Sequence, residues 1–265
     1  MNTAKFPSSW EVPEFDCEVL RPKAQQYAIC VFVINEGQKF QTQIEEMQLL
    51  AEHMDIIIAD GGSTDGSTES GFLEQHDVRT LLTKTGPGKL SAQMRMAFAY
   101  CLQEGYEGIL TIDGNRKDEP LQARRFIKAL EAGYDHVQGS RFIKGGEAQN
   151  TPWMRWLGIR LVHAPLISLS AGFHYTDTTN GFRAYSRRML LDPRVAPFRT
   201  VFSAYELHYY LAIRAARLGY KVTEVPVRRV YPAKGKVPTK ISPLKGTLQV
   251  LKTLVKAVLH QYDPS

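Results

Sequence analysis

Apolar and polar positions alternate in blocks along the first half of the chain. Runs of β-branched and other apolar residues predict buried strands over residues 27–34, 55–59, 78–82, 108–112 and 135–138. Between these runs the apolar positions recur at helical spacing, most clearly over residues 90–103. Strands that alternate with helices of this length form βαβ units around a parallel sheet. The pattern therefore predicts a Rossmann-like α/β fold with a mostly parallel sheet.

The pattern changes after residue 150. Residues 151–173 are rich in apolar side chains but include Arg155, Arg160 and His163. Such a segment suits either an amphipathic helix on a membrane surface or a core helix, and the sequence leaves both interpretations open. Later residues predict a helix over 203–218, a strand over 220–225 and a basic amphipathic helix over 244–259.

These elements define the expected domain organisation. Residues 1–26 show little periodicity and predict an irregular lead-in. Residues 27–225 form the predicted α/β domain, and residues 226–265 a basic loop and a C-terminal helix packed on that domain. Pro and Gly recur between Arg228 and Lys245, which predicts a loop that closes over bound phosphates.

Polar residues gather where the predicted strands end. The clusters are Asn35-Glu36, residues 60–67, residues 85–89 and residues 113–118. The carboxyl ends of parallel strands meet at one edge of a sheet, and ligands bind there. The sequence therefore predicts that four polar loops, including Lys89, converge on one ligand-binding rim.

Two of these clusters carry carboxylates at strand ends. Asp60 opens the run DGGSTDGS, in which the carboxylate can accept bonds from a ribose or base and the glycines let a nucleotide approach the backbone. Asp113 and Asn115 offer the hard oxygen ligands that Mg²⁺ and Mn²⁺ prefer beside substrate phosphates. Both runs are also ordinary turn sequences. Asp118 is the expected cap of a helix whose first turn holds Pro120.

Two later segments add candidate phosphate and ligand contacts. Arg141 follows a predicted strand, so its planar guanidinium can clamp a phosphate on the same rim, although a lone Arg there is more often a surface residue. The run DTTNGFR, with Asn180 and Arg183, is dense in small polar groups and predicts a binding loop.

Charge narrows the choice of partners. The net charge is +6, and residues 214–256 hold eleven Lys or Arg against one acid, Glu224. Such a basic segment favours phosphates or an anionic membrane, or is simply a solvated tail. It contains no recognisable nucleic-acid reading motif, so we expect no nucleic-acid partner. Three cysteines without C-x-x-C spacing favour a reducing cytosol over a disulfide framework or a zinc site.

Several motifs in order resemble the inverting glycosyltransferases of family two, and within them the dolichyl-phosphate mannose synthase-like branch. The resemblance covers residues 27–259 and is carried by IIIADGGSTDGS, TIDGNRKDEP, QGSRFIKGG, TDTTNGFRAYSRR and YELHYYLAIRAARLGYKVTEVPV. It implies a single GT-A domain and a UDP- or GDP-linked sugar donor. It also implies nucleoside contacts from Ile34, Glu36 and Asp60, with Asp113 at the metal and diphosphate site.

The resemblance also assigns later residues. It implies that Arg141 binds a phosphate of donor or acceptor, and that Lys240 matches the lysine of the branch's S-K-L-G segment. The chain departs from the family where D-x-D is Asp113-Gly114-Asn115, and where Lys117 replaces a frequent glutamine ligand. A protonated Lys is no metal ligand, so Arg116 and Lys117 are expected to supply part of the positive charge of a metal.

The acceptor is predicted from an absence. Relatives that use hydroxyl acceptors place an Asp general base after a Glu on a late helix, and here that position is Leu207, after Glu206. An ionised phosphate needs no base, so we expect a polyprenyl-phosphate acceptor, with Glu206 or His208 as alternative bases. The remaining alternatives are transfer to a sugar hydroxyl in surface polysaccharide synthesis, a sugar nucleotidyltransferase, and an inactive nucleotide-sugar-binding protein.

The sequence also predicts a location. No run of about 20 uncharged apolar residues and no signal-peptide pattern occurs. We therefore expect a cytoplasmic protein that contacts the cytoplasmic membrane face peripherally, through residues 151–173 and the basic C-terminal helix.

Overall fold

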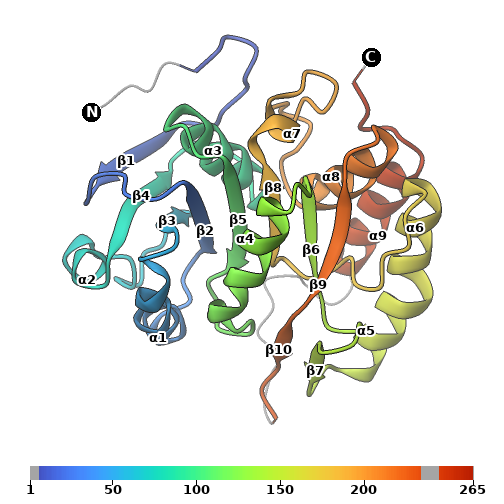
Figure 1. The fold of residues 1–265 in the computed structure, drawn as a ribbon, viewed down its shortest axis with the longest axis horizontal. Helices are drawn as coiled ribbons and strands as arrows, with labels where there is room; N and C mark the ends of the chain where they lie inside the picture. Colours follow the sequence, from blue (N-terminus) through green and yellow to red (C-terminus); the bar gives the residue numbers. More distant parts are fainter. Residues whose placement is uncertain (1–5, 234–244, 265) are drawn as a thin grey trace.

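One mixed sheet runs across the molecule, from β1 at one edge to β9 at the other (Figure 1). The computed structural model describes residues 6–233 and 245–264 of the chain. Eight strands follow the order β1-β4-β3-β2-β5-β8-β6-β9, and β7 and β10 form a separate pair. The strands are β1 Phe15–Val19, β2 Tyr27–Val33, β3 Asp55–Asp60, β4 Val78–Lys84, β5 Gly108–Asp113, β6 His136–Ser140, β7 Glu147–Gln149, β8 Arg183–Ser186, β9 Val222–Pro226 and β10 Arg228–Val230.

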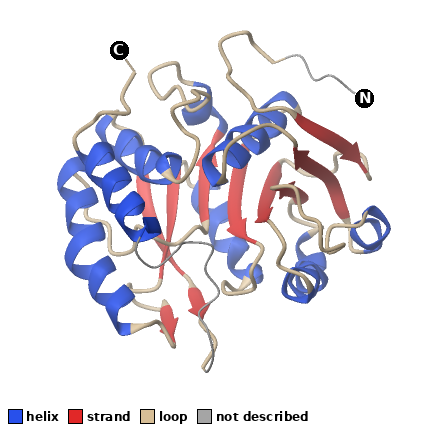
Figure 2. Ribbon diagram, turned by 180° about the vertical axis from the view of Figure 1, so that it is seen from behind, coloured by secondary structure: helices blue, strands red, loops and turns tan. Residues whose placement is uncertain are grey.

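Helices cover both faces of this sheet (Figure 2). They are α1 Gln38–Met47, α2 Ser70–Gln75, α3 Leu90–Gln103, α4 Ala123–Glu131, α5 Trp153–Gly158, α6 Ala164–Ala171, α7 Arg187–Leu191, α8 Glu206–Arg217 and α9 Lys245–Val258, with short 3-10 turns η1 Gln48–Leu50 and η2 Pro120–Gln122 and a π-helical segment η3 Ile159–His163. The predicted α/β architecture and mostly parallel sheet are confirmed.

Strand alternation divides the core into two layers. Along β2, Ile29 and Val31 pack in the layer that includes α1 and α4, whereas Cys30 and Phe32 pack in the layer that includes α3, α6, α8 and α9. Successive side chains of a strand point to opposite faces, so an unbroken apolar run marks a strand covered on both sides. This explains why residues 27–34 contain no alternation with polar positions.

The N-terminal segment is more ordered than its sequence predicts. Phe15–Val19 forms β1, which pairs antiparallel with β4 and makes an edge of the sheet. Ahead of it, the ring of Trp10 stacks on that of Phe198 with centroids 4.0 Å apart. The prediction of an irregular lead-in over 1–26 is wrong for this strand, because its alternating partly buried and exposed residues draw their pairing from β4 rather than from any local signal.

The second half of the sheet breaks the parallel pattern. β8 lies between β5 and β6 and pairs antiparallel with both, whereas β9 returns parallel to β6. Arg183 therefore begins a strand, although the sequence places it in a binding loop. The predicted boundary at 226 also shifts, because Pro226 ends β9 and β10 follows within the predicted loop. Residues 234–244, including Lys240, lie outside the described residues.

An exposed apolar surface covers the α5–η3–α6 segment. Trp153, Met154, Leu161 and Leu169 are between 66% and 83% exposed. The same segment also reaches the core through Ile167 and Ala171, so it carries both characters that the sequence left open. Among the described residues, no helix has the length and apolarity needed to cross a membrane.

Candidate active site

The loops after β2 and β3 are bonded into one surface. Asp60, at the end of β3, accepts hydrogen bonds from the Ser63 backbone N–H at 2.9 Å and from the Ser63 hydroxyl at 2.6 Å. The Asn35 backbone N–H donates to the Ser63 hydroxyl at 3.0 Å, and the Asn35 side-chain oxygen accepts from the Thr64 N–H at 2.8 Å. The predicted rim residues Ile34 and Glu36 stand on this same loop, with Ile34 40% exposed. These loops form a fixed polar surface at the predicted nucleoside position.

Lys89 and Glu206 both bond to the turn that precedes α8. The Lys89 side chain is exposed, and its backbone N–H donates to the carbonyl of Ser203 at 2.7 Å. The Glu206 carboxylate accepts from the N–H groups of Ser203 and Ala204 at 3.0 and 2.6 Å. Glu206 therefore holds the turn before α8 against the loop of Lys89, which is a structural task for a residue predicted to be catalytic.

Asp113 ends β5 beside an arginine that is distant in sequence. The Arg229 Nη2 lies 3.0 Å from Asp113 Oδ2, and its Nη1 also bonds the buried carboxylate of Asp118. Burial raises the pKa of Asp113, but Arg229 and Lys117 outweigh burial and hold that pKa below its usual value. Asp118 is thus an ion-pair partner and not the predicted helix cap; the cap position is Glu119, whose side chain makes no capping hydrogen bond.

The two basic residues after Asp113 differ in burial: Arg116 is exposed and Lys117 is buried. The exposed Arg116 guanidinium lies 2.5 Å from the Glu46 carboxylate, so its charge is already paired on the surface. Its contribution at the diphosphate site stays a prediction. Lys117 is buried, and burial followed by repulsion from Arg229 lowers its pKa. The Asn115 side-chain oxygen accepts the Lys117 backbone N–H at 3.3 Å.

Three cations surround the ring of Tyr231, which follows β10. Lys117 Nζ, Arg155 Cζ and Arg229 Cζ lie 5.5, 5.6 and 5.9 Å from the ring centroid. Arg155 also donates to the Tyr231 hydroxyl at 3.0 Å. Burial raises the pKa of Tyr231, but Arg229, Arg155 and Arg141 outweigh it and lower that pKa to about 8. These cations make the surroundings of Tyr231 a positive site, which attracts anions such as phosphate.

Arg141 belongs to a buried ion pair. Its Nε and Nη2 donate to the two carboxylate oxygens of Asp177 at 2.6 and 2.9 Å, and both side chains are almost fully buried. The third nitrogen, Nη1, is buried without a hydrogen-bond partner. Arg141 is close enough to Tyr231 to help lower its pKa, but most of its donors hold the loop that begins at Asp177, and its contact with a phosphate stays a prediction.

The same loop buries Asn180 and Arg183. Arg183 donates to the carbonyls of Thr178, Asn180 and His208, at 2.7, 3.0 and 2.5 Å, so its guanidinium is engaged by protein. Arg183 therefore shapes this loop, and its contact with a ligand stays a prediction. Asn180 is 1% exposed, its oxygen accepts from the Phe182 N–H at 2.9 Å, and its Nδ2 has no partner.

His208 is buried and lies close enough to Asp113 for each side chain to shift the pKa of the other. Burial, followed by repulsion from Arg183, lowers the pKa of His208 to about 3. The imidazole is therefore neutral at physiological pH and accepts a proton only weakly. This property limits the role of His208 as a general base.

Comparison with known proteins decides the family. The profile described as "Glycosyl transferase family 2" matches residues 28–192, which include both strand-end carboxylates and Arg141. The chain belongs to glycosyl transferase family 2. It is therefore a glycosyltransferase, and the matched residues contain the parallel half of the sheet.

Relatives and solved structures agree with this assignment. The chain is 26% identical over 216 residues to the polyprenol monophosphomannose synthase of Mycolicibacterium smegmatis, covering 80% of each chain. It is 28% identical to the undecaprenyl-phosphate mannosyltransferase of Micrococcus luteus, covering 73% of this chain and 79% of that one. Glucosyl-3-phosphoglycerate synthase from Mycobacterium tuberculosis, solved with Mn²⁺, UDP and phosphoglyceric acid, has the same fold, with a TM-score of 0.61, 19% identity and coverage of 88% and 78%. The expected GT-A fold is thus confirmed.

Two residues beside Asp113 were not predicted from the sequence. Arg229 and Tyr231 stand beside Asp113 and Lys117, although more than 100 residues separate them along the chain. Their one sequence signal is membership of the basic segment after residue 214. Which of eleven basic residues reaches the rim depends on the pairing of β10 with β7 and not on any local motif.

Proposed function

We propose that this glycosyltransferase moves a sugar from a nucleoside diphosphate onto a polyprenyl phosphate. The observation that carries the proposal is the positive site around Tyr231, which joins the Asp113 rim to the apolar α5–η3–α6 surface. A polyprenyl phosphate has a phosphate head and an apolar tail, so it needs both kinds of surface side by side. The names of the two bacterial relatives support the same acceptor class.

The donor is assigned to the loops after β2, β3 and β5. The carboxylate of Asp60 and the glycines after it suit a ribose and base, and the backbone there is held by side chains of its own loops. The diphosphate then reaches Asp113 and the positive site. UDP and GDP both suit this arrangement, and the choice between them is an outcome of the binding experiment below.

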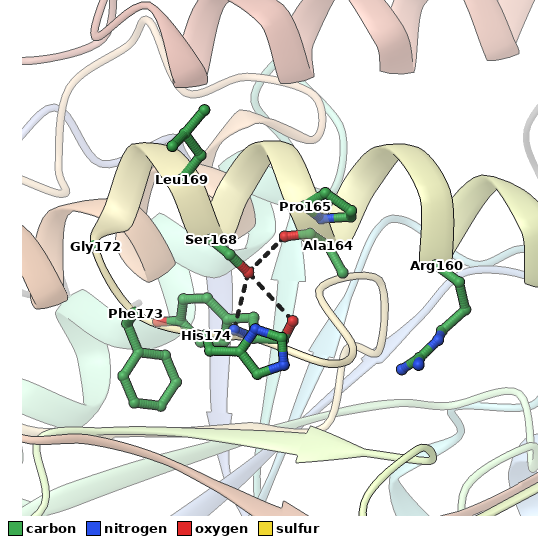
Figure 3. Close-up of a pocket in the computed structure, with 9 residues that line it drawn as sticks. Arg160, Ala164, Pro165, Ser168, Leu169, Gly172, Phe173 and His174 are labelled. Atoms are coloured by element: carbon green, nitrogen blue, oxygen red, sulfur yellow. Dashed lines mark hydrogen bonds between the residues drawn. The ribbon is translucent and has the colours of Figure 1, made fainter.

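The acceptor tail is assigned to an apolar pocket of about 460 Å³ next to α6. Figure 3 shows Phe173 and His174 on one side of the helix, with Arg160 farther along it. The Arg160 guanidinium lies 5.4 Å from the ring centroid of Phe142, the residue that follows Arg141. One lining residue of the pocket, Arg160, therefore lies next to the residue that follows the buried cation Arg141, so a lipid tail in the pocket would have its phosphate head near that cation.

A peripheral membrane contact follows from the same surface. The α5–η3–α6 segment, which carries exposed Trp153, Met154 and Leu161, lies on the same side of the molecule as α9, whose Leu248 is 69% exposed (Figure 1). Lys252 and Lys256 add positive charge to α9. Apolar side chains with basic neighbours suit the headgroup region of an anionic membrane, where a polyprenyl phosphate resides.

The two residues considered as general bases are poorly suited to that task. Glu206 already accepts two backbone N–H groups, and the low pKa of His208 makes it a weak base. A sugar hydroxyl needs a base as it attacks, whereas a phosphate is already ionised. This contrast favours the phosphate acceptor over the polysaccharide alternative.

Donor binding is tested by thermal unfolding with a panel of UDP- and GDP-sugars. A ligand at 100 times its dissociation constant adds about 2.7 kcal/mol to the free energy of unfolding, and so raises the melting temperature. We expect one nucleotide-sugar to do so and the matching free sugar to do nothing. A panel without any stabilising nucleotide-sugar contradicts the proposed donor class.

A further inference from the structure

The arrangement around Asp113 does not fit a divalent metal site. Asp113 Oδ2 is engaged by the guanidinium of Arg229 at 3.0 Å. The Asn115 oxygen accepts the Lys117 N–H. Among the described residues, no group of three or more His, Cys, Asp or Glu side chains could hold a metal ion. Mg²⁺ favours near-octahedral oxygen coordination, and here a carboxylate faces cations instead.

We propose that Arg229 and Lys117 neutralise the donor diphosphate in place of a divalent cation. This inference rests on the proposed function, because it needs a nucleoside diphosphate at the rim. Arg229 Nη2 carries a second N–H beyond the one bonded to Asp113, which can donate to a phosphate oxygen, and the buried ammonium of Lys117 adds a point charge. Asp113 holds Arg229 from one side, and the anchor is firm because the second nitrogen bonds the buried Asp118.

Unpaired polar atoms around this cluster point to a bound anion. Arg141 Nη1 and Asn180 Nδ2 are both buried donors without a hydrogen-bond partner. A buried donor left unpaired costs about 1–3 kcal/mol, so native proteins rarely leave one without water or ligand. Asn180 also lies within reach of Arg229, whose Nη1 is 3.4 Å from its side-chain oxygen. Phosphate oxygens would accept from these donors.

The transfer step places the new charge on this cluster. The bond between the sugar C1 and the β-phosphate oxygen breaks, and its electron pair stays with the departing nucleoside diphosphate. An oxygen of the ionised lipid phosphate forms the new bond to C1 from the opposite face, so no proton moves. Arg229 and Lys117 stabilise the charge that develops on the leaving group, as preorganised cations do.

Arg228 provides a matched control on the same strand. Its side chain points away from Arg229, and it bonds the exposed Glu147 at 3.0 Å and Gln149 at 2.8 Å. Removing Arg228 takes away one positive charge from β10 without touching Asp113. Effects of net charge are thereby separated from effects at the site.

The first experiment uses the wild-type protein and needs no substitution. Binding of UDP and GDP is measured by titration calorimetry with EDTA and with added Mn²⁺ or Mg²⁺, and sugar transfer is measured under the same conditions. We expect the dissociation constant of the preferred nucleotide to change by less than about twofold and transfer to persist in EDTA. Loss of binding and transfer in EDTA, with recovery on adding metal, overturns the inference. Absence of nucleotide binding under all conditions instead refutes the proposed function.

The second experiment removes the cation. Arg229→Gln alone leaves the buried Asp118 without its positive partner. It is therefore combined with Asp118→Asn, so that both charges are removed together. We expect nucleotide affinity in EDTA to fall by about 10- to 150-fold, the loss of charge-assisted hydrogen bonds, whereas Arg228→Gln binds as wild type. Far-ultraviolet circular dichroism and melting temperature verify that the variants fold. A folded double variant with unchanged affinity contradicts the role of Arg229.

Discussion

The parallel half of the sheet and its mixed half fix their polar residues in different ways. In the parallel half, Asp60, Asn35 and Ser63 bond to backbone and side chains within two adjacent loops. In the mixed half, Arg141 bonds Asp177 from 36 residues away, and Arg229 bonds Asp113 from 116 residues away. The loops after β2 and β3 thus depend on local turns, whereas the mixed half depends on buried charges that distant segments of the chain bring together.

This difference predicts unequal sensitivity to substitution. A turn in the parallel half is held by several hydrogen bonds, so the loss of one bond leaves the others. In a buried ion pair of the mixed half, such as Arg141 with Asp177, removal of one side chain leaves an uncompensated charge on the other. The predictions below start from that contrast.

Loss of Arg141 gives the largest expected effect. Arg141→Ala leaves Asp177 buried and unpaired, so we expect a loss of about 3–5 kcal/mol in the free energy of unfolding. Arg228→Ala removes an exposed pair with Glu147 and should cost about 1 kcal/mol or less. Urea denaturation of both variants checks this order, and equal losses would contradict the contrast between buried and exposed pairs.

Loss of the Asp113 charge is the next largest effect. Asp113→Asn removes the carboxylate that orients Arg229, so we expect sugar transfer to fall by about 100- to 1000-fold. The exposed Asp16 on β1 offers the control, since Asp16→Asn should leave transfer unchanged. Steady-state rates together with melting temperatures make the comparison. Near wild-type transfer by Asp113→Asn would reduce Asp113 to a turn residue.

The buried His208 links stability to pH. Its pKa is depressed from 6.5 to about 3, so between these values the unfolded chain binds a proton that the folded chain excludes. Stability must therefore fall as pH drops through 6.5, and His208 alone contributes a loss of about 2 kcal/mol between pH 7 and pH 5. His208→Gln should remove that part of the loss, whereas the same change at the exposed His53 should not. Urea denaturation of the wild type and both variants at pH 7 and pH 5 measures the loss of stability between these pH values. An equal loss in all three proteins would contradict the role of His208.

The membrane surface gives the smallest effect. Trp153→Ser combined with Leu161→Ser removes two exposed apolar side chains, and we expect binding to anionic vesicles to fall by about tenfold or more. Leu49→Ser, on an equally exposed leucine at η1, should bind as wild type. Co-sedimentation at low and high salt provides the measurement. If wild type fails to sediment with vesicles at low salt, the peripheral contact is refuted.

Sequence patterns predicted the strands of the parallel half well and those of the mixed half poorly. The strand ends at Asp60 and Asp113 follow apolar runs that are buried on both faces, so their position is legible from local residues. β8 carries no such run and owes its place to pairing between β5 and β6. Arg229 could not be chosen among its basic neighbours, because ion pairs over 100 residues apart leave no periodic signal.

Glu206 and Arg183 teach a related lesson. Both residue types suggest chemistry when they occur in a motif, yet here their polar atoms bond to backbone groups of the loops they support. A motif preserves the side chains that shape a site together with those that touch its ligand. Only the geometry separates the two.

The acceptor is the central claim, and one measurement tests it most directly. The protein is incubated with the preferred nucleotide-sugar carrying a radioactive label in the sugar, together with either a polyprenyl phosphate or a soluble glycan, and the products are partitioned between organic and aqueous phases. We predict label in the organic phase only when polyprenyl phosphate is present, with one nucleoside diphosphate released for each sugar transferred. Label that appears on the aqueous glycan, with none on the lipid phosphate, would contradict the account and favour a hydroxyl acceptor.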